Sequence, residues 1–136
     1  MPLLTGKCLC GNVFYQSDSE PAFTANCHCT DCRAATGAAY STICFIKADQ
    51  LTIEGDTQCF EHLSDRGHKM TKHFCPNCGS QLFGKNSAQE GMIGIRAGTI
   101  DQTDLVQPAR NVYVSSKIPS TLIDPNLPAS DRMPES

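Results

Sequence analysis

Seven of the nine cysteines in this 136-residue chain fall in three short clusters. The clusters are Cys8 and Cys10, then Cys27, Cys29 and Cys32, and finally Cys75 and Cys78. A zinc site that stabilises a fold uses four protein ligands, whereas a site that binds or activates a substrate keeps one position open. The first and third clusters together supply four thiolates, and the middle cluster supplies three. The sequence therefore predicts one closed metal site and one open site.

The first and third clusters have the surroundings of a shared structural site. Residues two apart in an extended segment face the same side, so the sulfurs of Cys8 and Cys10 can reach one ion. The third cluster lies in Cys-Pro-Asn-Cys-Gly, which suits a tight loop whose N–H groups point at sulfur. We expect Cys8, Cys10, Cys75 and Cys78 to hold one zinc ion. The alternatives are unpaired buried thiols or a disulfide, which a reducing compartment disfavours.

The middle cluster, Cys27, Cys29 and Cys32, supplies three thiolates within six residues, one ligand short of a tetrahedron. We expect a second zinc ion here, whose open position takes water, a substrate thiol or a histidine. The histidines of the chain are His28, His62, His68 and His73. His28 should point away from both neighbouring sulfurs if the segment is extended. A half-occupied site and plain reactive thiols are the alternatives.

Arg33 directly follows the middle cluster, and its charge has two interpretations. Zn²⁺ with three thiolates carries a net negative charge, so a nearby cation would help to hold an anionic fourth ligand. The other interpretation is a solvated side chain on the surface.

The two remaining cysteines, Cys44 and Cys59, lie in strand-like apolar segments. A buried free cysteine behaves as a small hydrophobic residue, so we expect both to pack in the core. Apolar surroundings raise the pKa of a thiol, which argues against a redox role for either residue.

The composition restricts the class of protein. With 40% hydrophobic and 18% charged residues, the chain is expected to fold as a globular protein. The net charge of -3 argues against a nucleic-acid-binding module, which normally has a basic face. No segment approaches the roughly 18 apolar residues of a membrane helix, and no secretory leader is visible at the start. We therefore expect a cytoplasmic protein without a nucleic-acid or membrane partner.

Short segments rich in β-branched and aromatic residues, bounded by Gly, Asp, Asn or Pro, predict a mainly β fold. The expected strands are residues 13–15, 41–46, 51–53, 57–62, 81–83, 92–95 and 112–114. A short helical turn is expected at Thr30 to Ala39, which contains four alanines and is weakened by Gly37. We expect one zinc-binding domain at residues 1–124 and a loosely held, proline-rich tail at residues 125–136.

The sequence resembles the family of glutathione-dependent formaldehyde-activating enzymes. The resemblance extends from about Gly6 to Lys117 and lies in the ordered combination of four segments. They read Gly-Lys-Cys-Leu-Cys-Gly-Asn-Val-Phe-Tyr from Gly6, Cys-His-Cys-Thr-Asp-Cys-Arg from Cys27, Phe-Cys-Pro-Asn-Cys-Gly-Ser from Phe74 and Ala-Gly-Thr-Ile-Asp from Ala97. The resemblance implies a small β-tent of antiparallel sheets, related to the Mss4-like fold.

The resemblance also implies roles for the cysteines and a reaction. Cys8, Cys10, Cys75 and Cys78 match the structural zinc ligands of the family, and Cys27, Cys29 and Cys32 match its catalytic zinc ligands. The implied substrates are a small thiol, glutathione, and an aldehyde, formaldehyde. Their addition gives S-hydroxymethylglutathione, and the activity is classed as a carbon–sulfur lyase acting in reverse. Asn111 and Ser120 stand where family members usually carry a His and a Trp.

Two other classes of function remain open at this point. One is a zinc-stabilised module that binds a protein partner and has no activity. The other is a thiol redox enzyme resembling the methionine sulfoxide reductases, with Cys44 or Cys59 as the reactive thiol. The sequence does not set the oligomeric state.

Overall fold

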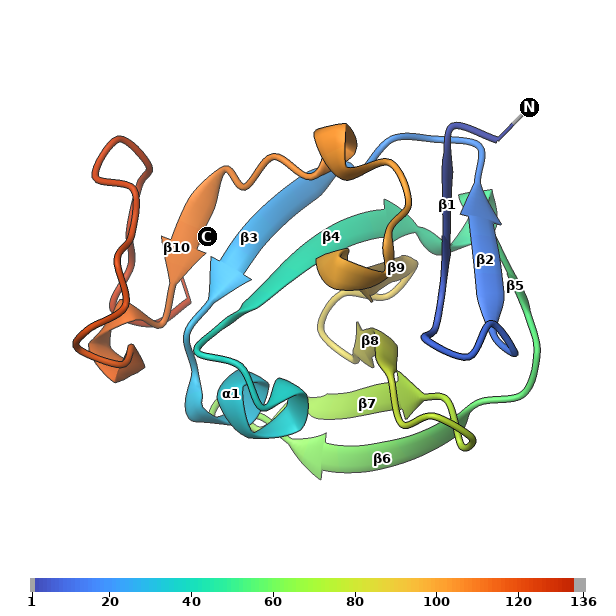
Figure 1. Ribbon diagram of the computed structural model, residues 1–136. Coiled ribbons are helices and arrows are strands. Elements are labelled where there is room, and N and C mark those ends of the chain that lie inside the picture. Colours follow the sequence, from blue (N-terminus) through green and yellow to red (C-terminus); the bar gives the residue numbers. More distant parts are fainter. Residues whose placement is uncertain (1, 134–136) are drawn as a thin grey trace.

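Two β-sheets build the fold, and one short helix lies beside them (Figure 1). The structure is a computed structural model that describes residues 2–133. The small antiparallel sheet has the strand order β1-β2-β5. Its strands are β1 (Leu4–Lys7), β2 (Phe14–Ser17) and β5 (Leu51–Glu54).

The large sheet has the strand order β10-β3-β4-β9-β8-β7-β6. Its strands are β10 (Arg110–Val112), β3 (Phe23–Cys27), β4 (Ser41–Lys47), β9 (Met92–Arg96), β8 (Gln81–Asn86), β7 (Lys69–Phe74) and β6 (Gln58–Leu63). All neighbours are antiparallel except β10, which pairs with β3 in parallel. This architecture confirms the expected mainly β fold class.

Helical structure is confined to short segments. The helix α1 (Thr30–Thr36) ends before Ala39 because Gly37 adopts a left-handed conformation with φ 70° and its N–H bonds back to the Arg33 carbonyl. The 3₁₀ turns are Ala48–Gln50, Ala97–Thr99, Thr103–Leu105 and Val114–Ser116. Within residues 2–133, none of the helices has the length and apolar character needed to cross a bilayer.

Four predicted strands agree closely with the structure. Those at 41–46, 51–53, 57–62 and 92–95 correspond to β4, β5, β6 and β9, with bounds within one residue. The prediction at 112–114 is wrong after Val112, because Tyr113 adopts a left-handed conformation with φ 58° and a 3₁₀ turn begins at Val114. The strands β1, β3 and β7 were not expected. The sequence of β7, Lys-Met-Thr-Lys-His-Phe, is too polar to indicate a strand by itself, and its position between β6 and β8 gives it that conformation.

The main core joins the two sheets. Its fully buried side chains include Leu4 and Val13 from the N-terminal part and Ile46, Leu82 and Ile95 from the large sheet. Cys44 is also fully buried in this cluster, so its predicted core position is confirmed. The prediction for Cys59 is wrong: this residue is exposed, because β6 is the last strand of the large sheet and most of its side chains remain in solvent.

The C-terminal segment returns alongside β10. Asn111 donates its backbone N–H to Pro128 at 2.9 Å, and its carbonyl accepts from Ser130 at 3.0 Å. These hydrogen bonds tie part of the proline-rich segment to the large sheet. The domain boundary after residue 124 and a loosely held tail stay predictions, and residues 134–136 of that tail lie outside the described part of the chain.

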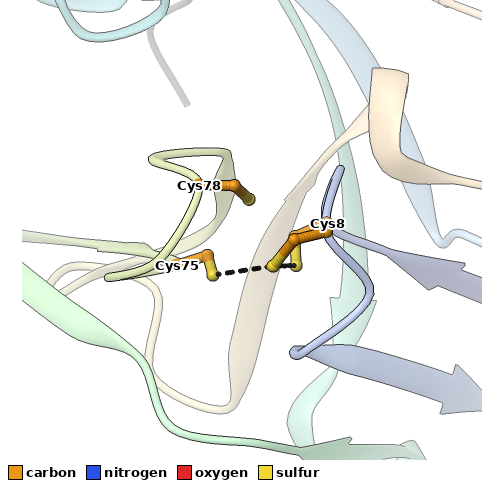
Figure 2. Close-up of side chains that lie close together, drawn as sticks. Cys8, Cys75 and Cys78 are labelled. Atoms are coloured by element: carbon orange, nitrogen blue, oxygen red, sulfur yellow. Dashed lines mark hydrogen bonds between the residues drawn. The ribbon is translucent and has the colours of Figure 1, made fainter.

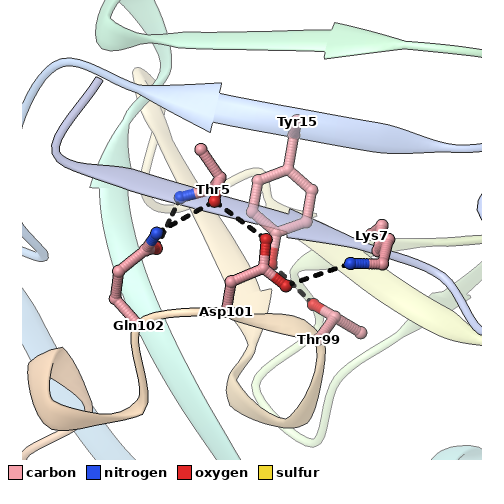
Figure 3. A network of polar contacts seen from close by, with 6 residues as sticks. All are labelled: Thr5, Lys7, Tyr15, Thr99, Asp101 and Gln102. Carbon is pink, nitrogen blue, oxygen red and sulfur yellow. Dashed lines mark hydrogen bonds and ion pairs between the residues drawn. The ribbon is translucent and has the colours of Figure 1, made fainter. Parts of the chain in front are cut away.

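A polar network fastens the small sheet to the segment that follows β9 (Figure 3). Thr5 donates its hydroxyl to Asp101 at 2.8 Å and its backbone N–H to the side chain of Gln102 at 2.7 Å. The Tyr15 hydroxyl donates to Thr99 at 2.7 Å, since the Thr99 hydroxyl itself donates to the Arg96 carbonyl. The network thereby holds the end of β1, from which Cys8 and Cys10 follow, in a fixed position.

Gly6 allows this close approach. A Cβ atom at position 6 would lie 2.2 Å from the Tyr15 hydroxyl oxygen and 2.5 Å from the Thr99 carbonyl oxygen. Only a residue without a side chain fits between them, which explains the glycine that precedes the first cysteine cluster.

We predict that Gly6→Ala lowers the free energy of unfolding by about 1–3 kcal/mol, because the added methyl group must displace packed atoms. Denaturant unfolding of the metal-loaded protein measures the change. Gly98→Ala is the matched control, because a Cβ atom there would meet no atom within 4 Å. Equal stability of the Gly6→Ala variant and the wild type would contradict the packing argument.

Candidate metal centres

The first cysteine cluster is assembled from two distant parts of the chain. Cys8 and Cys10 follow β1, and Cys75 and Cys78 lie in the loop between β7 and β8 (Figure 2). The four Sγ atoms lie within 4.8 Å of one another, with 3.6 Å between Cys8 and Cys10 and 3.7 Å between Cys10 and Cys75. Zinc–sulfur bonds of about 2.3 Å in a tetrahedron place sulfurs about 3.8 Å apart. The cluster therefore has the spacing of a closed four-sulfur metal site.

Backbone and side-chain groups around this cluster stabilise thiolates. Val13 donates its N–H to the Cys8 sulfur at 3.3 Å, and the Ser80 hydroxyl lies 3.2 Å from the Cys78 sulfur. Hydrogen bonds from Ser80 lower the pKa of Cys78 to about 5. Hydrogen bonds from Asn77 and then Asn12 also lower the pKa of Cys10. Against backbone hydrogen bonds from the loop, burial and the neighbouring thiols raise the pKa of Cys75 to about 11. Deprotonated sulfur is the form that binds metal, so the hydrogen bonds favour an ion at Cys10 and Cys78 in particular.

The second cluster comes from a single turn of chain. Cys27 is the last residue of β3, Cys29 is the N-cap of α1, and Cys32 lies in the first turn of the helix. The Cys29 sulfur accepts the Cys32 backbone N–H at 3.2 Å, which closes the turn. The three Sγ atoms lie within 4.8 Å of one another, and all nine cysteines, which fall inside residues 2–133, are free thiols. This arrangement can hold a metal ion on three sulfurs.

Within the described chain, no histidine joins the second cluster as a fourth ligand. His28 is fully buried, and its Nε2 lies 3.2 Å from the Asn111 side-chain oxygen. The expectation that it points away from the sulfurs is thus confirmed. His62 and His68 line a cavity beside the cluster. The fourth side of the cluster is therefore left to this cavity.

The cavity has a volume of about 380 Å³ and contains all three cysteines of the second cluster in its wall. Apolar side chains such as Ile43, Phe45 and Val112 form part of the lining. Its six positively charged residues outnumber its two carboxylates, Asp31 and Asp65. The positive residues are Lys72, Lys85, Arg96, Arg110, Arg66 and Arg132. The cavity suits a small ligand that carries negative charge.

The sequence suggested Arg33 as the cation beside the second cluster. In the structure this position is taken by Arg96, at the end of β9. Arg33 is half-buried and is not among the residues that line the cavity, whereas Arg96 is buried and lines it. Hydrogen bonds from Cys27 and Cys29 lower the pKa of Cys32 to about 3, and the charge of Arg96 acts in the same direction. The only sequence signal for Arg96 was a charge at the end of an apolar run, Met-Ile-Gly-Ile-Arg.

The two positions that depart from the family pattern lie outside the cavity lining. The Asn111 side chain is buried and accepts hydrogen bonds from Asn26 and His28, both at 3.2 Å, and Ser120 is exposed. Both departures therefore leave the groups that face the cavity in place.

Comparisons with known proteins agree with these features. The sequence profile of the family described as "Glutathione-dependent formaldehyde-activating enzyme" matches residues 3–116. A crystal structure of a Rhodobacter sphaeroides protein, solved by structural genomics, is similar in fold, with a TM-score of 0.58 and 19% sequence identity. The similarity covers 76% of this chain and 96% of that chain. Because the profile spans most of the residues, this chain belongs to the family of glutathione-dependent formaldehyde-activating enzymes.

Proposed function

We propose that this protein binds two zinc ions and catalyses the addition of glutathione to formaldehyde. Cys8, Cys10, Cys75 and Cys78 would hold the structural ion, and Cys27, Cys29 and Cys32 would hold the catalytic one. Support comes from the family membership and from the sulfur spacing of both clusters. The observation that carries the proposal is the position of the three-sulfur cluster in the wall of a basic cavity.

The sulfur ligands fit zinc, which prefers thiolate and imidazole ligands in tetrahedral sites. When bound on three thiolates, zinc supplies a Lewis acid that keeps a substrate thiol deprotonated at neutral pH. The chain contributes the charge balance. Arg96 lies against the cysteines, so it offsets part of the negative charge that three thiolates bring into the cavity.

Two arginines of the cavity wall, Arg110 and Arg132, would bind the substrate. Glutathione carries two carboxylates, and arginine is well suited to hold a carboxylate through two parallel hydrogen bonds. Arg110 and Arg132 lie in the cavity wall, and the buried Nε atom of Arg110 has no hydrogen-bond partner in the described chain. A carboxylate of the substrate would satisfy this group.

The reaction joins the thiol sulfur to the carbonyl carbon of formaldehyde. The π electron pair of the carbonyl moves to oxygen, and the proton that the thiol loses ends on that oxygen, which gives S-hydroxymethylglutathione. In the reverse direction this is a carbon–sulfur bond cleavage, so the enzyme is a lyase by class. The reduced thiols and the glutathione substrate fit a cytoplasmic enzyme.

A redox function for the remaining thiols has less support. Cys44 is buried in the core, where burial raises the pKa of its thiol, and Cys59 is exposed on the edge strand. Neither residue lines the cavity.

We predict that Cys29→Ser lowers the zinc content from two ions to one per chain and abolishes glutathione binding, while the protein stays folded. The reason is that one ligand of the open site is lost and the closed site lies elsewhere. Zinc analysis and calorimetry with glutathione measure both effects. Cys59→Ser, at an exposed thiol outside both clusters, should behave as the wild type. Unchanged zinc content in the Cys29→Ser variant would rule out the site.

We also predict that Cys75→Ala gives insoluble protein or a much lower melting temperature. This change opens the four-sulfur cluster, and structural zinc contributes on the order of 10 kcal/mol of apparent binding energy in small peptides. Circular dichroism melting of the purified variant measures the effect. A soluble Cys75→Ala variant that melts at the wild-type temperature would show that this cluster does not stabilise the fold.

A further inference from the structure

A buried lysine lines the cavity beside the three-cysteine cluster. Lys72 is on β7, in the interior of the large sheet, and only 7% of its surface is exposed. Its neighbour on β8 is Gly84, which has no side chain. A lysine is rarely buried unless its ammonium group is paired. The buried position of Lys72 therefore indicates that its ammonium group has a partner.

The partner of Lys72 is His62 on the adjacent strand β6. The Lys72 Nζ atom is hydrogen bonded to His62 Nε2. On the other side of the ring, His62 Nδ1 lies 3.2 Å from the Leu63 carbonyl oxygen, which can only accept a hydrogen bond. Nδ1 therefore carries the ring hydrogen, and the lone pair of Nε2 faces the Lys72 ammonium group.

The same histidine is partly exposed to solvent. His62 Nδ1 lies 3.9 Å from a carboxylate oxygen of Asp31, whose side chain is 51% exposed, whereas the His62 side chain is 20% exposed. His62 thus lies between the buried Lys72, to which it is hydrogen bonded, and the exposed Asp31, from which it is separated by more than a hydrogen-bond distance.

Burial and four neighbouring groups affect the pKa of Lys72 in opposite directions. Burial lowers the pKa of Lys72, and the nearby positive charge of Arg96 adds to this effect. The charges of Cys32, Asp31 and Cys29 oppose it. Lys72 therefore combines a hydrogen-bond donor with a reduced cost of losing its proton, as a general acid requires.

We propose that Lys72 is a catalytic residue that donates a hydrogen bond to the aldehyde oxygen and then protonates it. This inference rests on the proposed addition of glutathione to formaldehyde. The sulfur–carbon bond forms, and the carbonyl π pair moves to oxygen. Lys72 gives one proton to that oxygen. The proton released from the thiol replaces it on Lys72, so no proton is gained or lost and no oxidant or reductant is needed.

The variant Lys72→Met tests this role, because methionine keeps an unbranched side chain as far as Cε and removes the ammonium group. We expect unchanged zinc content and unchanged glutathione affinity by calorimetry. The enzyme-dependent rate of exchange between free and hydroxymethylated glutathione, measured by exchange NMR after subtraction of the uncatalysed rate, should fall by about 100-fold or more. Lys69→Met is the matched control, because Lys69 is on the same strand, pairs with Glu61 at the surface and does not line the cavity.

The outcomes separate the two claims. A wild-type rate in the Lys72→Met variant would overturn the role of Lys72 and leave the proposed function intact. Loss of zinc or of glutathione binding in this variant would also overturn it, because Lys72 would then only neutralise the thiolates. A zinc-loaded wild type that does not accelerate exchange would overturn both claims.

A second variant covers the case in which Lys72→Met is insoluble. His62→Gln removes the ring that is hydrogen bonded to Lys72 and changes a partly exposed side chain. We expect its catalysed rate to fall at unchanged glutathione affinity, because Lys72 loses the partner that positions it. A wild-type rate in His62→Gln would overturn this positioning role.

Discussion

Four sulfurs meet from the two ends of a long stretch of chain, and the proposed structural zinc depends on this meeting. Cys10 and Cys75 are separated by 65 positions in sequence, yet their sulfurs lie 3.7 Å apart. Around this point the small sheet packs against the large one through Leu4, Val13 and the side chains of β4, β8 and β9. The hydrogen bonds among Thr5, Asp101 and Gln102 fix β1 from the other side. A metal ion held by these sulfurs would cross-link a small core that has no tryptophan.

The two cysteine clusters are built in different ways, which suits different tasks. The closed cluster joins distant segments and surrounds its centre with sulfur, so it has no position for a substrate. The three-sulfur cluster belongs to one strand end and the helix turn that follows it, and its remaining side faces a basic cavity. Because the clusters share no residue, the three-sulfur cluster can change without dismantling the four-sulfur one.

The cysteine spacing predicted which sulfurs come together, because thiols have few other reasons to cluster in this pattern. Apolar strands were also predictable from their residues. The sequence could not predict β7, whose lysines and histidine acquire strand conformation from β6 and β8. For the same reason Lys72 and His62 were not recognised as neighbours. Their contact depends on strand register, which no local pattern in either segment encodes.

Two other predictions show how tertiary position decides the role of a residue. Cys59 has the sequence surroundings of a core residue and is exposed, because β6 has a neighbour on one side only. Arg33 is next to the cluster in sequence, but the cation that acts on Cys32 is Arg96, which β9 brings in from far along the chain. The residue next to the cluster in sequence was therefore not the one whose charge acts on its sulfurs.

The central claim is that the three-cysteine cluster holds a zinc ion whose open position faces the substrate cavity. A crystal structure of the zinc-loaded protein soaked with glutathione, with diffraction recorded at the zinc absorption edge, tests this most directly. The account predicts an anomalous peak among Cys27, Cys29 and Cys32, with the glutathione sulfur as its fourth ligand and the rest of the molecule in the cavity. A peak at the four-cysteine cluster alone, or glutathione bound away from the cavity, would contradict it.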